Sequence, residues 1–149
     1  MCIIRPFNIY GPGQDDRFLV PGIIRQVLDG REVVVDALAP RRDYVYVDDL
    51  VDALVLSYSR SPIGLTVLNI ASGHSLSVGD VIAVVQHAAG TNLPVFTRDI
   101  SRPHELADVV GDPSRAQQVL GWRPATSIEE GMSRCLKFER ANFGSDSDS

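Results

Sequence analysis

Short β-rich runs alternate with helical segments along most of this 149-residue chain, and this alternation constrains its fold more than any other feature. β-Branched and aromatic residues favour strands, whereas apolar residues three and four positions apart favour helices. Strands are predicted at 2–4, 32–36, 44–46, 66–70 and, as the last of them, 95–97. Helices are predicted at 18–28, from residue 48 or 49 to about 58, at 77–89, from residue 112 to about 121, and from residue 127 onward. Such an order is typical of α/β or α+β proteins.

The ends of these predicted helices carry residues that favour helix termination. Ser77 with Asp80 three positions later resembles a capping box, and Gly30 and Gly90 follow two of the helices as stops. A second set of caps is predicted where a polar residue directly precedes a helix. These caps are Asp48 or Asp49, Asp112 with Pro113 at the first helical position, and Ser127. Residues 39–42 are predicted to be a loop between strands.

The first predicted strand, residues 2–4 (CII), raises a question of pairing. Its apolar run indicates a buried strand, and Arg5 with Pro6 ends it. A buried parallel strand needs neighbours that are supplied through crossover connections. We therefore expect this strand to leave an edge that another segment or another chain could pair with.

Composition excludes several classes of function. The net charge of −5 gives no reason to expect binding to nucleic acid or to an anionic membrane. Cys2 and Cys135 are far apart and form no metal or redox motif, so both are expected to be reduced, structural residues. The apolar runs are shorter than a membrane span and the first residues do not form a signal peptide. A cytoplasmic location is expected.

Three segments stand in a specific order. They are residues 5–14 (RPFNIYGPGQ), residues 42–50 (RDYVYVDDL), and a last segment that combines 112–116 (DPSRA), 120–124 (LGWRP) and 128–131 (IEEG). Together they are similar to the extended short-chain dehydrogenase/reductase family, in its NAD-dependent nucleotide-sugar epimerase/dehydratase branch. The similarity covers residues 1–143, and it matches only the C-terminal, substrate-binding half of such an enzyme. Residues 144–149 are expected to be a disordered tail.

The resemblance implies a fold and a set of site residues. The fold would be α/β, with the last strands of a Rossmann-like parallel sheet followed by the small mixed α/β substrate-binding domain. Pro6 and Phe7 would lie beside the nicotinamide of the cofactor, and Asn8 would reach the substrate. The alternative for Asn8 is that it only builds a turn with 11–13. Tyr10 is interpreted as a packing residue.

The resemblance also implies how a nucleotide sugar is held. Arg42 would grip the diphosphate through its planar guanidinium, whereas Arg41 is interpreted as a solvated loop residue. Arg102 would be a second diphosphate ligand, although His104 and Glu105 replace the Gly-Asp that usually follows in the family's Arg-Pro-Gly-Asp pattern. A further set would line the nucleotide base, or equally could be an ordinary helix start: Leu19, Val20 and Pro21.

Three aspartates invite a metal-site interpretation, which we reject. Asp43, Asp48 and Asp49 lie close together in the sequence, but aspartates directly before an apolar helix are usually caps. No metal site is predicted in this chain.

The family's catalytic pair, Tyr-x-x-x-Lys, is missing from the sequence. The four tyrosines are followed four positions later by Gln14, Asp48, Leu50 and Pro62, and the single lysine, Lys137, follows Ser133. An isolated tyrosine with a pKa near 10 is a poor acid/base group at neutral pH. No catalytic residue is therefore predicted, and we expect this chain to begin after the catalytic pair.

The glycine motif that binds the cofactor is missing as well. Residues 11–13 (GPG) do not replace it, because a proline lacks the N–H that a phosphate-binding turn requires. NAD or NADP is implied for the full-length family, and this chain alone is not expected to retain it.

Two hypotheses remain open. The first is a C-terminal fragment of an NAD(P)-dependent epimerase/dehydratase that binds the sugar-nucleotide diphosphate and has no turnover of its own. The second is a non-catalytic nucleotide-sugar-binding or oligomerisation module. The partner would be a nucleotide-diphosphate sugar, together with either a second copy of the chain or a Rossmann half that precedes it in the family.

Overall fold

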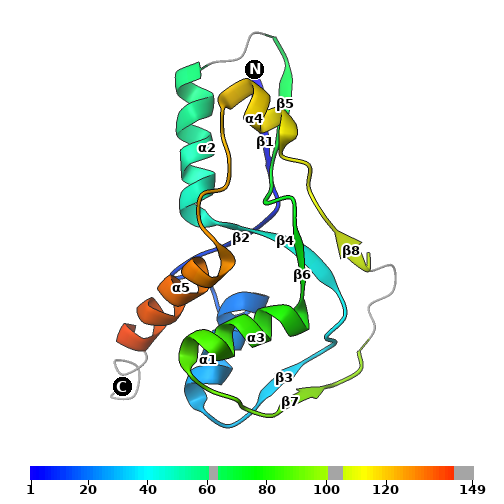
Figure 1. The fold of residues 1–149 in the computed structure, drawn as a ribbon, viewed down its shortest axis with the longest axis vertical. Coiled ribbons are helices and arrows are strands. Elements are labelled where there is room, and N and C mark those ends of the chain that lie inside the picture. Colours follow the sequence, from blue (N-terminus) through cyan, green and yellow to red (C-terminus); the bar gives the residue numbers. More distant parts are fainter. Residues whose placement is uncertain (61–63, 101–105, 143–149) are drawn as a thin grey trace. The chain divides into compact units, whose positions relative to one another are not determined.

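The structure is a computed structural model that describes residues 1–60, 64–100 and 106–142, and its elements are labelled in Figure 1. The chain forms two units. Unit 1 consists of Met1–Tyr10, Arg41–Leu76 and Asp108–Ser127, and unit 2 consists of Gly11–Pro40, Ser77–Ala107 and Ile128–Ser149. Each unit is thus assembled from three segments that are separated in the sequence. The predicted tail at 144–149 lies outside the described residues.

Unit 1 contains parallel strand pairs. Strand β1 (Cys2–Pro6) pairs in parallel with β5 (Thr66–Ile70), with Cys2 opposite Thr66. A second sheet has β4 (Arg41–Tyr46) beside β2 (Asn8–Tyr10), β6 (Ser75–Ser77) and β8 (Asp108–Val109). The β2–β4 and β4–β8 pairs are parallel. With helices joining these strands, the predicted α/β class is confirmed.

Two helices cover one face of the β1–β5 pair. Helix α2 (Val47–Arg60) packs on β1, β2 and β4, and helix α4 (Ser114–Leu120) packs on β5 and α2. The side chains that alternate inward from the strands meet apolar residues of both helices, and each fully buried one stabilises the fold by about 1.5–3 kcal/mol. This core consists of Val45, Ala53, Leu68, Ile70, Ala116, Leu120 and Trp122.

Unit 2 is a three-helix cluster with one small sheet. Helices α1 (Leu19–Asp29), α3 (Val78–Ala89) and α5 (Ile128–Asn142) pack against one another. Strand β3 (Val33–Val35) pairs in parallel with β7 (Val95–Thr97). Cys135 lies in this core, and burial raises the pKa of its thiol to about 11. The thiol is therefore neutral at pH 7, as expected for a structural cysteine.

The predicted helix stops and one capping box are confirmed in unit 2. Ser77 Oγ accepts a hydrogen bond from Asp80 N at 3.0 Å, and Asp80 Oδ2 accepts one from Ser77 N at 2.9 Å. Gly30 and Gly90 adopt the left-handed conformation, with φ of 73° and 71°. Glycine tolerates this conformation better than other residues, so both helices end at these positions.

Several predicted element boundaries are wrong. Arg41 and Arg42 belong to β4 rather than to a loop, because pairing with β8 extends the strand backward. Helix α2 already begins at Val47, so Asp48 and Asp49 lie inside its first turn and do not cap it. Helix α4 begins at Ser114, one residue later than predicted.

Short strands account for the remaining differences. Strand β8 follows β7, so 95–97 is not the last strand, and β2 and β6 were not predicted. Strand β1 is less buried than its apolar run indicates, since Ile3 is 40% exposed. Among the described residues, β1 has β5 as its neighbour on one edge only.

No helix in the described part of the chain combines the length and the apolar character that crossing a membrane requires.

Candidate functional site

Asn8 lies against strand β4 in unit 1. The parallel pairing of β2 and β4 places Asn8 opposite Tyr44, and Asn8 Nδ2 donates a hydrogen bond to the backbone oxygen of Asp43 at 2.9 Å. Asn8 is exposed. Two segments that are 35 residues apart in the sequence are thus joined where the predicted substrate residues lie.

Arg42 sits at the beginning of β4, where it pairs with Val109 of β8. Its side chain is half-buried, and Nη1 donates a hydrogen bond to the backbone oxygen of Arg41 at 2.7 Å. Side chains alternate along a strand, so Arg42 and Tyr44 point to the same face of the sheet. Burial raises the pKa of Tyr44, and the positive charge of Arg42 partly opposes this rise. Tyr44 is therefore neutral near pH 7.

Asp43, between these two residues, is fully buried with 0% exposure. Its Oδ1 accepts hydrogen bonds from the N–H and the hydroxyl of Ser72, both at 2.7 Å. Its Oδ2 accepts from Gly73 N and Gly111 N, both at 3.0 Å. The interpretation of Asp43 as a helix cap is wrong, because its donors come from the segments that follow β5 and β8.

Arg41 is also better anchored than predicted. Its Nη2 donates to the backbone oxygen of Ser75 at 2.7 Å and its Nε donates to Ser75 Oγ at 3.2 Å. The Arg41 Nε to Asp108 Oδ2 distance is 4.0 Å. Arg41 is therefore a strand residue that links β4 to β6 and β8, and its interpretation as a solvated loop residue is wrong.

Tyr10 packs, as interpreted from the sequence. It is 2% exposed and lies edge-on to Tyr44, with ring centroids 6.3 Å apart, and to Tyr46, at 5.5 Å. Edge-to-face pairs of this kind stabilise a fold by about 0.5–1.5 kcal/mol beyond burial. The three rings fix β2 against β4 and so support the position of Asn8.

Pro6 and Phe7 are the predicted cofactor contacts: Pro6 is the last residue of β1, and Phe7 lies between β1 and β2. Pro6 is exposed, whereas Phe7 is half-buried and its N–H donates to the backbone oxygen of Ile70 at 3.0 Å. The Phe7 ring packs so closely on Gly111 that a Cβ there would come within 2.7 Å of it. This segment does not offer the run of N–H donors that a dinucleotide diphosphate needs.

Asp49 is a second buried carboxylate in unit 1, at 3% exposure. It accepts hydrogen bonds from Ala125 N at 3.1 Å, Thr126 N at 3.2 Å and Thr126 Oγ1 at 3.3 Å. Its backbone oxygen accepts from Trp122 Nε1 at 2.8 Å. Asp49 therefore fixes the segment after α4 to helix α2, which is a structural task.

The other predicted substrate residues lie in unit 2 or beyond the described residues. Val20 is 4% exposed and Pro21 is buried, so both face the core beneath α1, while Leu19 is partly exposed. This arrangement agrees with the ordinary helix start that was the alternative for 19–21. Arg102 lies outside the described residues.

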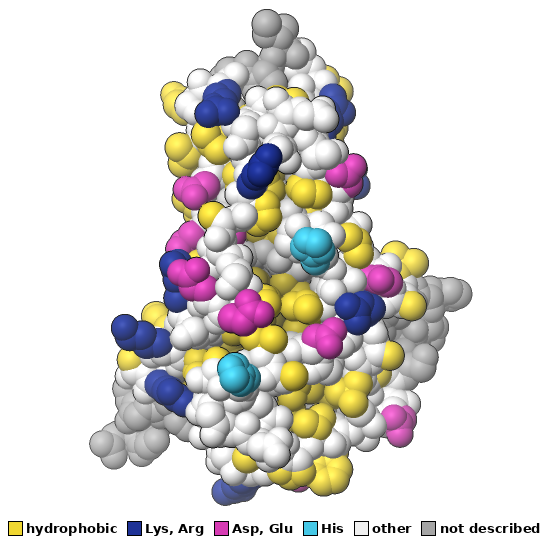
Figure 2. Space-filling model, in the orientation of Figure 1, with side chains coloured by type: hydrophobic (Ala, Val, Ile, Leu, Met, Phe, Trp, Pro, Cys, Tyr) yellow, Lys and Arg dark blue, Asp and Glu magenta, His cyan; other side chains and the backbone are white. Residues whose placement is uncertain are grey.

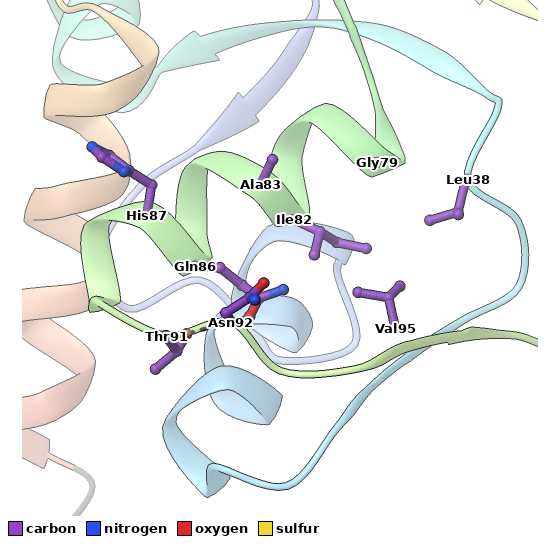
Figure 3. A pocket seen from close by; sticks show the side chains of 9 residues that line it. All are labelled: Leu38, Gly79, Ile82, Ala83, Gln86, His87, Thr91, Asn92 and Val95. Carbon is purple, nitrogen blue, oxygen red and sulfur yellow. Dashed lines mark hydrogen bonds between the residues drawn. The ribbon is translucent and has the colours of Figure 1, made fainter.

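A hollow of about 450 Å³ opens beside α3 in unit 2 (Figure 3). Leu38, Ile82 and Val95 form its apolar wall, and His87 points away from them. Gln86 is committed to its own loop, since its amide donates to Leu93 O at 3.3 Å and accepts from Leu93 N. The hollow is lined by Leu38, Gly79, Ile82, Ala83, Gln86, His87, Thr91, Asn92 and Val95. This set contains no arginine or lysine, so it does not suit a diphosphate.

Unit 1 thus carries two of the predicted binding groups on neighbouring strands, the guanidinium of Arg42 and the amide of Asn8. The backbone oxygen of Asp43 accepts the hydrogen bond of the Asn8 side chain. The sequence predicts Arg42 and Asn8 as binding residues, and it did not predict the hydrogen bonds of Asp43. Once β4 is known to include residues 42 and 43, strand alternation places Asp43 on the face opposite Arg42. The donors Ser72, Gly73 and Gly111 had no comparable local signal.

Comparison with known proteins gives consistent matches. The family model described as GDP-mannose 4,6 dehydratase matches residues 1–135. The chain is 32% identical over 145 residues to a UDP-glucose 4-epimerase of Mycolicibacterium smegmatis, covering 92% of this chain and 44% of that protein. It is 28% identical over 144 residues to a GDP-6-deoxy-D-mannose reductase of Pseudomonas aeruginosa, covering 91% and 47%.

A solved structure extends the comparison to the fold. The UDP-glucuronic acid 4-epimerase of Bacillus cereus, in complex with UDP-glucuronic acid and NAD, has a TM-score of 0.84 at 25% identity. The match covers 95% of this chain and 45% of that one. The chain thus spans less than half the length of the relatives it matches.

Proposed function

The chain belongs to the GDP-mannose 4,6 dehydratase family of extended short-chain dehydrogenase/reductases, which includes nucleotide-sugar epimerases, and on this premise we propose that it holds the diphosphate of a nucleotide sugar. Arg42 is the proposed diphosphate ligand and Asn8 the proposed contact on the sugar side. Arg102 is a further proposed diphosphate ligand, and Leu19 a proposed contact to the base. The observation that carries the proposal is the pairing of β2 with β4, in which Asn8 lies opposite Tyr44 and donates to the backbone oxygen of Asp43, the residue next to Arg42.

A complete enzyme of this family would use NAD or NADP to accept the hydride from a sugar hydroxyl. Pro6 and Phe7 are the residues of this chain that would contact its nicotinamide. We propose that the chain alone does not retain the cofactor and has no turnover, because its sequence contains neither the glycine motif nor Tyr-x-x-x-Lys.

Calorimetric titration with UDP, GDP and dTDP tests the binding proposal. At least one should bind more tightly than its nucleoside, and Arg42→Gln should weaken that binding by about tenfold or more, because a charged hydrogen bond contributes roughly 1.5–3 kcal/mol. Arg41→Gln is the matched control: it removes the same charge from the neighbouring residue, whose side chain is bound to Ser75. Equal losses for the two variants would contradict the role of Arg42, and turnover of a nucleotide sugar by the purified chain would contradict the absence of catalysis.

A second proposed function, pairing with a Rossmann half, is favoured by the outer face of α2. Val51, Leu54, Val55 and Tyr58 are 50%, 46%, 60% and 87% exposed, and they recur at helical spacing. In Figure 2 hydrophobic side chains gather along the left upper edge, where Figure 1 shows α2. The opposite face of α2 buries Ala53 in the core, so the helix is apolar on two faces, which is typical of a helix between two layers.

Strand β1 supports the same proposal. Parallel strands normally have neighbours on both edges and cover on both faces, whereas β1 pairs with β5 alone among the described strands. We infer that a strand-and-helix module completes this side of unit 1, with its strand beside β1 and its helix against α2. A homodimer through the same helix is the competing outcome.

A further inference from the structure

Asp43 uses all of its hydrogen-bonding capacity inside unit 1. An ionised carboxylate has about four acceptor sites, and Asp43 meets four donors at 2.7 to 3.0 Å. Burying a charge is costly unless such donors compensate for it. The donors come from two segments, Ser72–Gly73 after β5 and Gly111 after β8, so a single side chain ties both segments to β4.

The same residue also holds the proposed ligand-binding groups. Its backbone oxygen accepts the hydrogen bond from Asn8 Nδ2. Arg42 is its neighbour in the strand and pairs with Val109, two residues before the Gly111 that donates to Asp43. Displacement of Asp43 would therefore shift Arg42, Asn8 and the start of β4 together.

We propose that Asp43 is a positioning residue that sets the geometry of Arg42 and Asn8 for a diphosphate. This inference rests on the proposed function. Asp43 does not touch the ligand, since it is fully buried and points to the face opposite Arg42. It acts by fixing the backbone from which the two binding side chains extend.

Asp49 provides a matched comparison for a purely structural role. It is also a buried carboxylate of unit 1 that accepts backbone and hydroxyl hydrogen bonds. Its donors, Ala125 and Thr126, lie in a segment that carries neither Arg42 nor Asn8. Substitution of either aspartate by asparagine replaces one acceptor oxygen with an NH₂ group. This group would face N–H or O–H donors instead of accepting from them, so both variants should be destabilised.

The experiment measures how much the diphosphate adds to binding. Calorimetry is carried out on the unmodified full chain and on the Asp43→Asn and Asp49→Asn variants. For each protein it gives the dissociation constant of a nucleoside divided by that of its diphosphate, for the pairs uridine and UDP, guanosine and GDP, and thymidine and dTDP. Urea unfolding of each variant records the structural cost. Asp43→Asn should lower the ratio for the binding nucleotide by about tenfold, the effect of one misplaced charged hydrogen bond. Asp49→Asn should leave this ratio within about twofold of the original at a comparable loss of stability.

The outcomes separate the inference from the function it rests on. If the unmodified chain shows no diphosphate preference for any of the three pairs, the proposed function is wrong and the inference falls with it. If the unmodified chain shows the preference and Asp43→Asn retains it, or if both variants lose it equally, only the positioning role is wrong. Should Asp43→Asn fail to fold, Ser72→Ala removes one of the four donors and should lower the ratio by a smaller factor, whereas an unchanged ratio would overturn the inference.

Discussion

At the scale of single residues, Gly111 is the glycine with the least room for a side chain in the described part of unit 1. A Cβ there would lie 2.7 Å from the Phe7 ring and would overlap Ala71. Gly111→Ala should therefore destabilise the chain by roughly 1–3 kcal/mol, because the packed neighbours must shift. Urea unfolding followed by circular dichroism measures this loss.

Gly79→Ala is the control for Gly111→Ala. A Cβ at Gly79 would make ordinary contacts at 3.6 Å with Ser77 Oγ and 3.9 Å with Leu38 Cβ. Because alanine favours a helix over glycine, this variant should gain roughly 0.5–1 kcal/mol. A Gly111→Ala variant as stable as Gly79→Ala would show that the packing of Phe7 on Gly111 is looser than the structure indicates.

The sequence predicts some site residues and not others, for a physical reason that these positions share. Arg42 and Asn8 stand in recognisable local motifs, which is why the sequence predicts a binding role for them. The buried carboxylates Asp43 and Asp49 were taken for helix caps, because the rule for caps uses neighbours in the sequence. Their actual donors are 29 to 77 residues away, and no local pattern reports such partners.

At the scale of elements, the capping box of α3 makes a testable contribution. Ser77 and Asp80 exchange two hydrogen bonds that satisfy N–H groups at the helix start. Ser77→Ala should cost about 1 kcal/mol in the free energy of unfolding. Ser59→Ala serves as the comparison, because Ser59 Oγ donates a hydrogen bond to Leu56 O within its own exposed helix turn. A loss in both variants of the same size would argue that the cap contributes nothing specific.

Elements were predicted well where local chemistry determines them. Helices α1 and α3 have apolar periodicity, and each is followed by a left-handed glycine, so the sequence predicts where they end. Strands β2, β6 and β8 have only two or three residues each, and pairing with β4 defines them. A strand that is defined by pairing with its neighbour carries little sequence pattern of its own, which is why the sequence did not predict these three strands. The same pairing moved the start of β4 back to Arg41.

At the scale of the whole molecule, the division into units could not be seen in the sequence. Each unit draws on three separate segments, so no linker or change of composition marks a boundary. The resemblance to a larger family supplied what local patterns could not, namely that this chain corresponds to part of a protein. The matches to less than half the length of the relatives agree with that expectation.

The uncovered face of α2 leads to the last prediction. If this face normally meets another module, the chain alone should self-associate weakly at tens of micromolar and bind a hydrophobic dye, because exposed apolar stripes favour association. Val51→Lys should reduce both effects, since it places a charge on the stripe. Asp52→Lys introduces the same side chain on the polar flank of the same helix and should leave both unchanged. Sedimentation velocity and dye fluorescence measure the two effects. A tight dimer below one micromolar would favour homodimerisation over pairing with a Rossmann half, and a monomer without dye binding would contradict both, because the stripe would then have no tendency to be covered.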